Sequence, residues 1–291
     1  MTLFPIPSGG NGAAITLGPD NNVWFTENDV DRVGRVTPAG TISEVELPSF
    51  GTAASITRGP DGELWVRELG FGGALLAAID PANPVTGNIL EFFLPDFSEF
   101  GGITGGPDGN LWLTGTFSDS IGPLATDGTQ PASAYLLNHG SGVNYIARGP
   151  DGNMWFTALN SNQVGKITPS GSVTQYPIPT ADSSPQKIVA APDGNLWFTE
   201  DAGQIGMVTP AGAINEFLIQ GFGCPHGITV GSDNNLWVAD QCGLVERFTP
   251  TNPPVETDFS VTYDPSDIVS GPDGNLWFTE FSGQLIGRMS T

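Results

Sequence analysis

The residues best suited to chemistry lie between Cys224 and Cys242. His226 and Asp240 stand at equal distances on either side of Asp233, at the centre of a Ser-Asp-Asn-Asn turn. In a hairpin centred there, the imidazole would face the carboxylate. A carboxylate orients an imidazole and raises its proton affinity, which suits a general acid or base near neutral pH. The alternative is a structural His–Asp hydrogen bond that caps a strand end.

The two cysteines also stand at matching offsets from the same turn. This placement predicts a disulfide between Cys224 and Cys242, which would contribute about 3 kcal/mol and brace the strand ends that carry His226 and Asp240. A free pair of thiols in a reducing compartment is the alternative. Mass measurement with and without reductant separates the two.

These residues belong to a repeat that organises the whole chain. Every tryptophan lies in one copy of a segment that reads GPDGNLWFTE at 271–280. The other copies lie at 18–27, 59–68, 106–115, 149–158, 191–200 and 231–240. A recurring period of this size indicates an array of equivalent supersecondary units.

Each copy contains turn chemistry between two short β-rich runs. Proline, aspartate and glycine favour a tight turn, so each copy predicts a hairpin. A third run follows at 33–38, 164–169 and 205–210, and a fourth at 41–48 and 172–179. Four strands per period predict a seven-bladed β-propeller of four-stranded antiparallel blades, with its tryptophans buried between neighbouring blades.

The two chain ends complement each other. Residues 2–7 have the fourth-strand pattern, whereas residues 285–289 have a third-strand pattern that no fourth strand follows. We therefore expect the N-terminal strand to complete the C-terminal blade and close the ring, which removes two open sheet edges. The continuous repeat predicts a single domain over residues 1–291, and we expect a monomer.

In each hairpin the residues that begin the first strand and those that end the second strand lie next to each other, on the face of the propeller opposite the turns. The residue that begins the first strand occupies the inner position, nearest the channel. At the inner position there, blades 1 to 3 have small residues, namely Ala13, Ala54 and Gly101. Blades 4 to 7 instead have polar residues that could bind a substrate, namely Asn144, Gln186, His226 and Ser266. An uneven rim of this kind predicts a ligand site on the channel face. Drift among repeats is the alternative, and His139 is expected on the same face.

Carboxylates end most of the second strands. Glu27, Glu68, Glu200, Asp240 and Glu280 share this position, with only Arg67 and Lys187 as nearby bases. Hard cations take several oxygen ligands, so Mg²⁺ is a candidate cofactor with Ca²⁺ as the alternative, and Glu200 and Glu280 are candidate ligands. The alternative is that these carboxylates bond loop amides.

Composition excludes some partners. Nine Lys and Arg residues against 31 Asp and Glu give a net charge of −22, which repels nucleic acid and anionic membranes. No apolar run is long enough to span a bilayer, and Met1 does not begin a signal peptide. A secreted protein that lacks its leader here is the favoured expectation, with a cytoplasmic protein as the alternative.

The repeat, followed by third strands such as 205–210 and fourth strands such as 173–179, resembles the virginiamycin B lyase family. The resemblance covers essentially the whole chain. It implies a seven-bladed propeller and a Mg²⁺-dependent elimination that linearises streptogramin B depsipeptides. It also implies that catalytic histidines and carboxylates lie on the channel face of the last blades.

Two motifs of the family meet this sequence in those blades. The penultimate-blade motif P-H-[AG]-I matches residues 225–228, which include His226. The last-blade motif, acidic-P-H-G-I, aligns with residues 264–268. Asp264 stands at the acidic position of the motif, and Ser266 stands where the motif has histidine. No histidine follows Trp277, where the family's enzyme has another catalytic one.

Three hypotheses for the function follow. The first is a lyase-like propeller that binds a small molecule or peptide, with His226 as base, Asp240 as its orienting partner, and Asp264, Glu200 and Glu280 as cation ligands. The second is a non-catalytic propeller that recognises a protein or glycan through loop aromatics, namely Phe50, Phe71, Phe97, Phe100 and Phe222. The third is a Ca²⁺-dependent lactonase with ligands from Glu280, Asn144 and Asp240.

Overall fold

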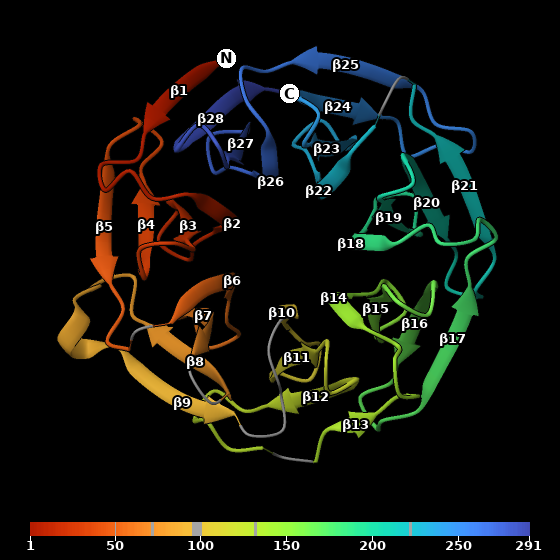
Figure 1. Ribbon diagram of the computed structural model, residues 1–291, viewed down its shortest axis with the longest axis horizontal. Helices are drawn as coiled ribbons and strands as arrows, with labels where there is room; N and C mark the ends of the chain where they lie inside the picture. Colours follow the sequence, from red (N-terminus) through yellow and green to blue (C-terminus); the bar gives the residue numbers. More distant parts are fainter. Residues whose placement is uncertain (50, 71–72, 95–100, 131–132, 221–222) are drawn as a thin grey trace.

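Seven antiparallel sheets stand around a central opening in the computed structural model (Figure 1). The structure describes residues 1–49, 51–70, 73–94, 101–130, 133–220 and 223–291. Within these residues each sheet has four strands. The first strand of each repeat lies at the channel, and the second, third and fourth follow it outward. The sequence-based prediction of a seven-bladed propeller is therefore confirmed.

The strands form four concentric layers. The innermost strands are β2 (Gly12–Leu17), β6 (Thr52–Arg58), β10 (Ile103–Gly105), β14 (Val143–Arg148), β18 (Pro185–Ala190), β22 (Pro225–Val230) and β26 (Pro265–Ser270). The second strands are β3 (Val23–Glu27), β7 (Leu64–Gly70), β11 (Leu111–Gly115), β15 (Met154–Ala158), β19 (Leu196–Glu200), β23 (Leu236–Asp240) and β27 (Asn275–Glu280). The third strands are β4 (Arg32–Val36), β8 (Gly73–Ile79), β12 (Ser120–Leu124), β16 (Gln163–Ile167), β20 (Gln204–Val208), β24 (Leu244–Phe248) and β28 (Leu285–Ser290). The outer strands are β5 (Ile42–Glu46), β9 (Leu90–Leu94), β13 (Tyr135–Leu136), β17 (Val173–Pro177), β21 (Ile214–Leu218), β25 (Glu256–Ser260) and β1 (Thr2–Pro5), and a short 3-10 helix, η1 (Thr86–Asn88), precedes β9.

The ring closes through its N-terminal strand. β1 pairs antiparallel with β28, from Thr2 opposite Arg288 to Pro5 opposite Leu285. The backbone N–H of Ile6 extends this pairing by donating to the carbonyl of Gln284 at 3.0 Å. The first strand of the chain is thus the outer strand of the last blade, and the two termini lie close together (Figure 1).

Each hairpin has a turn end, formed by its G-P-D-G-type turn, and an open end, where its first strand starts and its second strand stops. At the turn end of blade 4, Asp151 accepts hydrogen bonds from the backbone N–H of Asn153 at 3.2 Å and from the indole N–H of Trp155 at 3.0 Å. Gly152 takes a φ of +77°, as the turn chemistry predicts. The Asp–Trp bond recurs in all seven blades at 3.0–3.2 Å.

The tryptophans form the core between blades. All seven are at most 1% exposed. Trp155 stacks on Tyr176 of its own outer strand and packs against Ile188, Leu196 and Phe198 of blade 5. This arrangement confirms that the apolar strand faces are covered by the neighbouring blade. In the described part of the chain no helix is long and apolar enough to cross a membrane.

Candidate functional site

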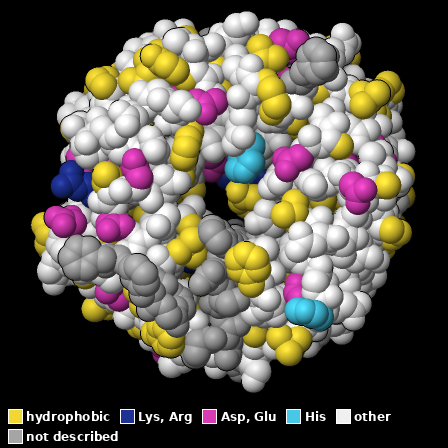
Figure 2. Space-filling view, viewed as in Figure 1, with side chains coloured by type: hydrophobic (Ala, Val, Ile, Leu, Met, Phe, Trp, Pro, Cys, Tyr) yellow, Lys and Arg dark blue, Asp and Glu magenta, His cyan; other side chains and the backbone are white. Residues whose placement is uncertain are grey.

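The central channel holds a cavity of about 200 Å³ that inner strands of all seven blades line. Figure 2 shows the ring hollowed at its centre on this face. Blades 1 to 3 line it with small or apolar side chains together with Ser55. Blades 4 to 7 contribute polar groups, namely Asn144, Tyr145, Lys187, His226, Ser266 and Asp267. The uneven rim is therefore present at the cavity.

The inner strands reach the cavity through β-bulges. In blade 6, Pro225 pairs with Asp240, and the next pair is Gly227 with Ala239, so that His226 is the extra residue. A bulge of this kind bends the strand and re-aims the side chain. The predicted pairing of His226 with Asp240 is thus wrong, because reflection about the turn assumes equal numbers of residues on both strands.

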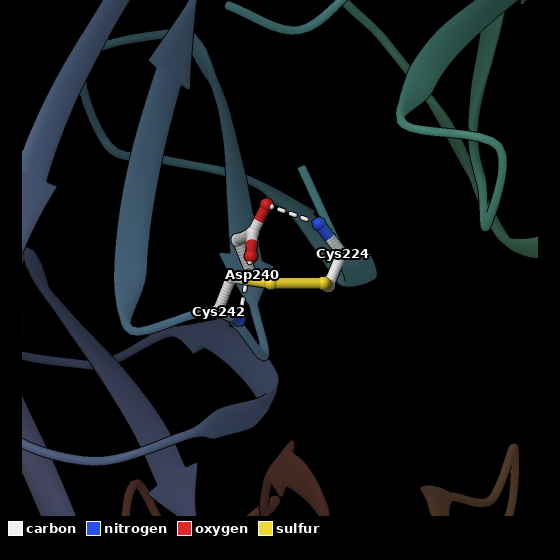
Figure 3. The surroundings of a disulfide bond; sticks show 3 residues. All are labelled: Cys224, Asp240 and Cys242. Carbon is white, nitrogen blue, oxygen red and sulfur yellow. Dashed lines mark hydrogen bonds between the residues drawn. A yellow bond between two sulfur atoms is a disulfide. The ribbon is translucent and has the colours of Figure 1, made fainter. Parts of the chain in front are cut away.

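Asp240 serves a different part of blade 6. Its carboxylate accepts hydrogen bonds from the backbone N–H of Cys224 at 2.8 Å and of Cys242 at 2.7 Å. These cysteines form a disulfide with a Cα–Cα distance of 5.5 Å, and Figure 3 shows the carboxylate between their amides. The fully buried Asp240 therefore orients the disulfide-linked chain segments rather than the imidazole.

His226 is oriented by the backbone of the last blade. Its Nδ1 lies 3.0 Å from the carbonyl oxygen of Ser266. A carbonyl can only accept, so Nδ1 donates its proton, and in the neutral tautomer that makes this bond the lone pair lies on Nε2. The edge of the ring meets Tyr145, with ring centroids 6.0 Å apart. The imidazole is thus held beside the cavity by the last blade and by Tyr145.

A chain of amides links the rim of blades 4 and 5 to a second carboxylate. Asn144 donates to the Oε1 of Gln186 at 3.1 Å, and Gln186 donates to the Oδ2 of Asp201 at 2.7 Å. Burial raises the pKa of Asp201, while the hydrogen bond from Gln186 and, to a smaller extent, the charge of a protonated His226 oppose that shift. Asp201, which the sequence did not single out, is therefore the carboxylate that interacts electrostatically with His226.

An ion pair crosses the channel from blade 5 to blade 7. The Lys187 ammonium contacts both carboxylate oxygens of Asp267 and lies 5.7 Å from the centroid of the Tyr145 ring. The Asp267 carboxylate also accepts from the backbone N–H of Ile15 at 3.1 Å and of Ile268 at 2.8 Å. Burial, together with the negative charges nearby, raises the pKa of Tyr145. The pair fixes an ammonium group at the wall of the cavity.

The sequence contains a signal for this ion pair. The position that follows the rim residue is occupied in chain order by Ala14, Ser55, Gly102, Tyr145, Lys187, Gly227 and Asp267. Lys187 and Asp267 are the only charged residues in this set. Two opposite charges in one otherwise uncharged layer of a narrow channel are expected to pair.

The carboxylates that end the second strands lie away from the cavity wall. Glu27, Glu68, Glu200 and Glu280 are fully buried, and none of them lines the cavity. Glu27 accepts from the hydroxyl of Ser8, which lies in the segment that enters blade 1. Burial raises the pKa of Glu27 and of Glu68 to about 7 and that of Glu200 to about 8. In blade 1 the Glu27 carboxylate thus forms a hydrogen bond with the chain segment that leads into the blade.

Two further predicted site residues lie outside the cavity. Asp264 accepts from the backbone N–H and the hydroxyl of Ser282 at 3.0 and 2.7 Å. The pKa of the neighbouring Glu280 is raised by burial and by the charge of Asp264. The His139 side chain is fully exposed, and its Nδ1 lies 3.5 Å from an oxygen of Asp119.

Two alternative sites can also be placed. The lactonase ligand set is not brought together, because Asn144 lines the cavity whereas Asp240 and Glu280 do not. The five phenylalanines of the recognition hypothesis lie outside the residues that the structure describes, namely Phe50, Phe71, Phe97, Phe100 and Phe222.

Comparison with known proteins gives a family. Residues 1–73 and 83–243 match the model of the Virginiamycin B lyase family. The chain belongs to this family. No curated protein matches the chain.

Solved structures of this family align over nearly the whole chain. A streptogramin B lyase is 29% identical, with 99% of this chain and 96% of that chain covered and a TM-score of 0.88. A virginiamycin B lyase from Staphylococcus aureus is also 29% identical, with 100% and 98% covered and a TM-score of 0.88. A catalytically inactive His-to-Ala variant of the S. aureus enzyme with quinupristin is 30% identical, with 100% and 99% covered and a TM-score of 0.87.

Proposed function

We propose that this protein binds a small cyclic peptide or depsipeptide at the channel mouth and opens it by elimination, with His226 as the base. The observation that carries the proposal is the hydrogen bond between Nδ1 of His226 and the carbonyl of Ser266, which leaves Nε2 free beside the cavity. Family membership supports the class of ligand.

The elimination needs one base and one group that stabilises negative charge. Nε2 of His226 takes the proton from the carbon next to a carbonyl, the electron pair forms a C=C bond, and the ester C–O bond breaks to release a carboxylate. No water is consumed. Lys187 has three N–H donors, of which Asp267 occupies two, and the third is available to the carbonyl oxygen.

A divalent cation belongs to this proposal. The buried Glu280 carboxyl group accepts from the backbone N–H of Tyr263, and the negative charge of Asp264 acts on it. This donor set suits a hard cation such as Mg²⁺, with Ca²⁺ as the alternative. When bound there, the ion would neutralise the two carboxylates of the last blade outside the cavity.

A second function is ligand recognition without turnover. Ser266 stands where the last-blade motif of the family has a histidine. The S. aureus enzyme with one histidine replaced by alanine is catalytically inactive and yet is known with quinupristin. In this second function the polar residues that blades 4 to 7 contribute to the cavity bind the ligand, and no bond of the ligand is broken.

Incubation with quinupristin, followed by mass spectrometry and by calorimetric binding, separates these functions. Elimination opens the ring without a change in mass, whereas hydrolysis adds one water. We expect His226→Ala to abolish turnover while the free energy of unfolding changes by less than about 1 kcal/mol. Ser55→Ala, on the opposite wall of the cavity, is the matched control and should retain turnover.

Each outcome of this experiment decides something. Turnover that is lost in His226→Ala and reduced by EDTA supports the elimination. Saturable binding by the wild type without turnover favours recognition. Equal turnover by wild type and His226→Ala excludes His226 as the base.

A further inference from the structure

The outer half of blade 6 differs from that of its neighbours at one buried contact. In four blades a phenylalanine of the second strand covers a glycine of the third so closely that a methyl group on the glycine would overlap the ring. These pairs are Phe25 with Gly34, Phe156 with Gly165, Phe198 with Gly206 and Phe278 with Gly287. In blade 6 the paired residues are Val238 and Glu246. The smaller valine leaves room in which the Glu246 side chain is fully buried.

Two more carboxylates lie on the same face of the outer strands. Glu246 of β24 is directly opposite Asp258 of β25, and Glu256 precedes Asp258 by two residues, on the same face of that strand. One carboxylate oxygen from each of the three residues lies within 4.8 Å of the others. Three carboxyl groups thus converge on a volume the size of one ion.

No basic side chain of the described residues forms an ion pair with this cluster. The neighbouring Arg247 lies on the other face of β24, with its guanidinium over the Trp237 ring and a bond to Thr257. No N–H group of the described residues donates to the Glu246 carboxyl group, which instead contacts the Asp240 side chain, so that a further acid lies beside the cluster. A buried carboxylate without such a donor is costly unless a cation reaches it.

We propose that Glu246, Glu256 and Asp258 bind one divalent cation, and that Ca²⁺ is preferred. Ca²⁺ accepts oxygen ligands at about 2.4 Å in a flexible geometry, which suits three carboxyl groups that come from two neighbouring strands. Mg²⁺ requires opposite ligands at about 4.2 Å and a near-ideal octahedron. Asp258 is exposed, so the ion enters from solvent and keeps water ligands on that side.

Blade 1 has a single carboxylate at the position that Asp258 occupies in blade 6. Glu44 occupies the position of Asp258, and it faces Gly34 rather than a glutamate. Its carboxylate lies 3.4 Å from Arg32 and accepts from the backbone N–H of Ser8 at 2.9 Å. In blade 6 Glu256 accepts from the backbone N–H of Gln220 in the same way, but no arginine pairs with any of its three acids among the described residues. Glu44 is therefore a matched control.

Calorimetric titration of the protein of residues 1–291 with CaCl₂ and with MgCl₂ tests the site. We expect a Ca²⁺-binding event that Asp258→Asn weakens at least tenfold, that Glu246→Gln abolishes, and that Glu44→Gln leaves unchanged. Ca²⁺ should raise the melting temperature of wild type and Glu44→Gln but not of Glu246→Gln. Asp264 and Glu280 are intact in every variant, so any ion bound there remains in all titrations.

The proposal is overturned if wild type binds no Ca²⁺, or if Asp258→Asn and Glu246→Gln bind it as wild type does. If Glu246→Gln does not fold, the exposed Asp258→Asn decides alone. Because the readout is ion binding, a failure of the proposed elimination leaves this result standing. A failure of the ion site likewise leaves the channel proposal untouched.

Discussion

The turn ends and the open ends of the seven hairpins differ in how far their side-chain contacts are repeated from blade to blade. At the turn end every blade repeats one set of bonds, in which an aspartate holds the indole of a tryptophan four residues later. At the open end the rim residues differ between blades, and their partners come from other blades, as when His226 bonds the Ser266 carbonyl. The contrast indicates that this propeller separates stability from ligand chemistry along each hairpin.

The separation has a physical basis. A contact between residues two to four apart forms within one hairpin and needs nothing from the rest of the ring. The Lys187–Asp267 pair joins residues 80 positions apart, so it exists only after blades 5 and 7 have been placed. Side chains at the open end can therefore change without disturbing the hairpins that carry them.

The largest effect is expected at the turn end. Trp155→Ala should reduce the free energy of unfolding by about 3–5 kcal/mol, because it removes a fully buried ring from the interface between blades 4 and 5. Chemical denaturation measures this loss. Ligand affinity of the folded variant should match that of wild type, and a large loss of affinity would contradict the separation of the two ends.

The disulfide tests whether the open end of blade 6 contributes to stability. The Cys224→Ser, Cys242→Ser double variant should lose about 3 kcal/mol, since the cross-link closes a segment with a sequence separation of 18. Denaturation of wild type with and without reductant should reproduce this difference, and mass measurement confirms the oxidation state. An unchanged midpoint would show that the cross-link adds nothing at this end.

Loss of the ion pair across the channel should have a moderate effect. Lys187→Met leaves the buried Asp267 carboxylate without its ammonium, at a cost of about 1–3 kcal/mol, since the lysine is partly exposed. The Lys187→Met, Asp267→Asn double variant should recover part of this loss and still bind ligand weakly. If the single variant binds ligand as tightly as wild type, Lys187 has no part in the site.

The smallest effect is the pH dependence of the open end. Burial raises the pKa of Glu27 and Glu68 from 4.5 to about 7, so the folded state binds more protons than the unfolded chain between these values. Their contribution is complete below about pH 4.5 and is lost as pH rises through about 7. We expect the free energy of unfolding to fall from pH 5 to pH 8 as both carboxyl groups lose their protons in the folded state.

The Glu27→Gln, Glu68→Gln double variant should show a flatter profile than wild type over the same range in thermal denaturation. The difference between the two profiles isolates these carboxyl groups from the other titrating residues. Parallel profiles would show that both side chains are already ionised in the folded protein at low pH.

Much of the fold could be predicted from residues that act locally. The proline, aspartate and glycine of each turn fix the hairpins, and the recurring tryptophans fix the number of blades. The unpaired pattern of residues 2–7 predicted the ring closure that β1 and β28 make. The rim residues Asn144, His226 and Ser266 were also correctly placed at the channel.

The partners of the rim residues could not be predicted in this way. Counting residues outward from the turn predicted that His226 is paired with Asp240. The bulge in β22 instead pairs Pro225 with Asp240, and His226 contacts the last blade. His139 lies at the open end of blade 4, on the face where it was expected, but its side chain is outside the cavity against Asp119. Bulges and inter-blade contacts depend on how neighbouring strands pack, which no single hairpin contains.

The amino-acid sequence by itself thus determined seven hairpins, the ring that they form and the two termini that close it. Only the tertiary structure decided that Ser266 orients the imidazole, that Lys187 meets Asp267, and that Glu246 is buried beside two further acids. The reason is the range of the interactions. Turn and strand preferences are set within a few residues, whereas the environment of a side chain at the channel or between outer strands is set by blades that meet only in the closed ring.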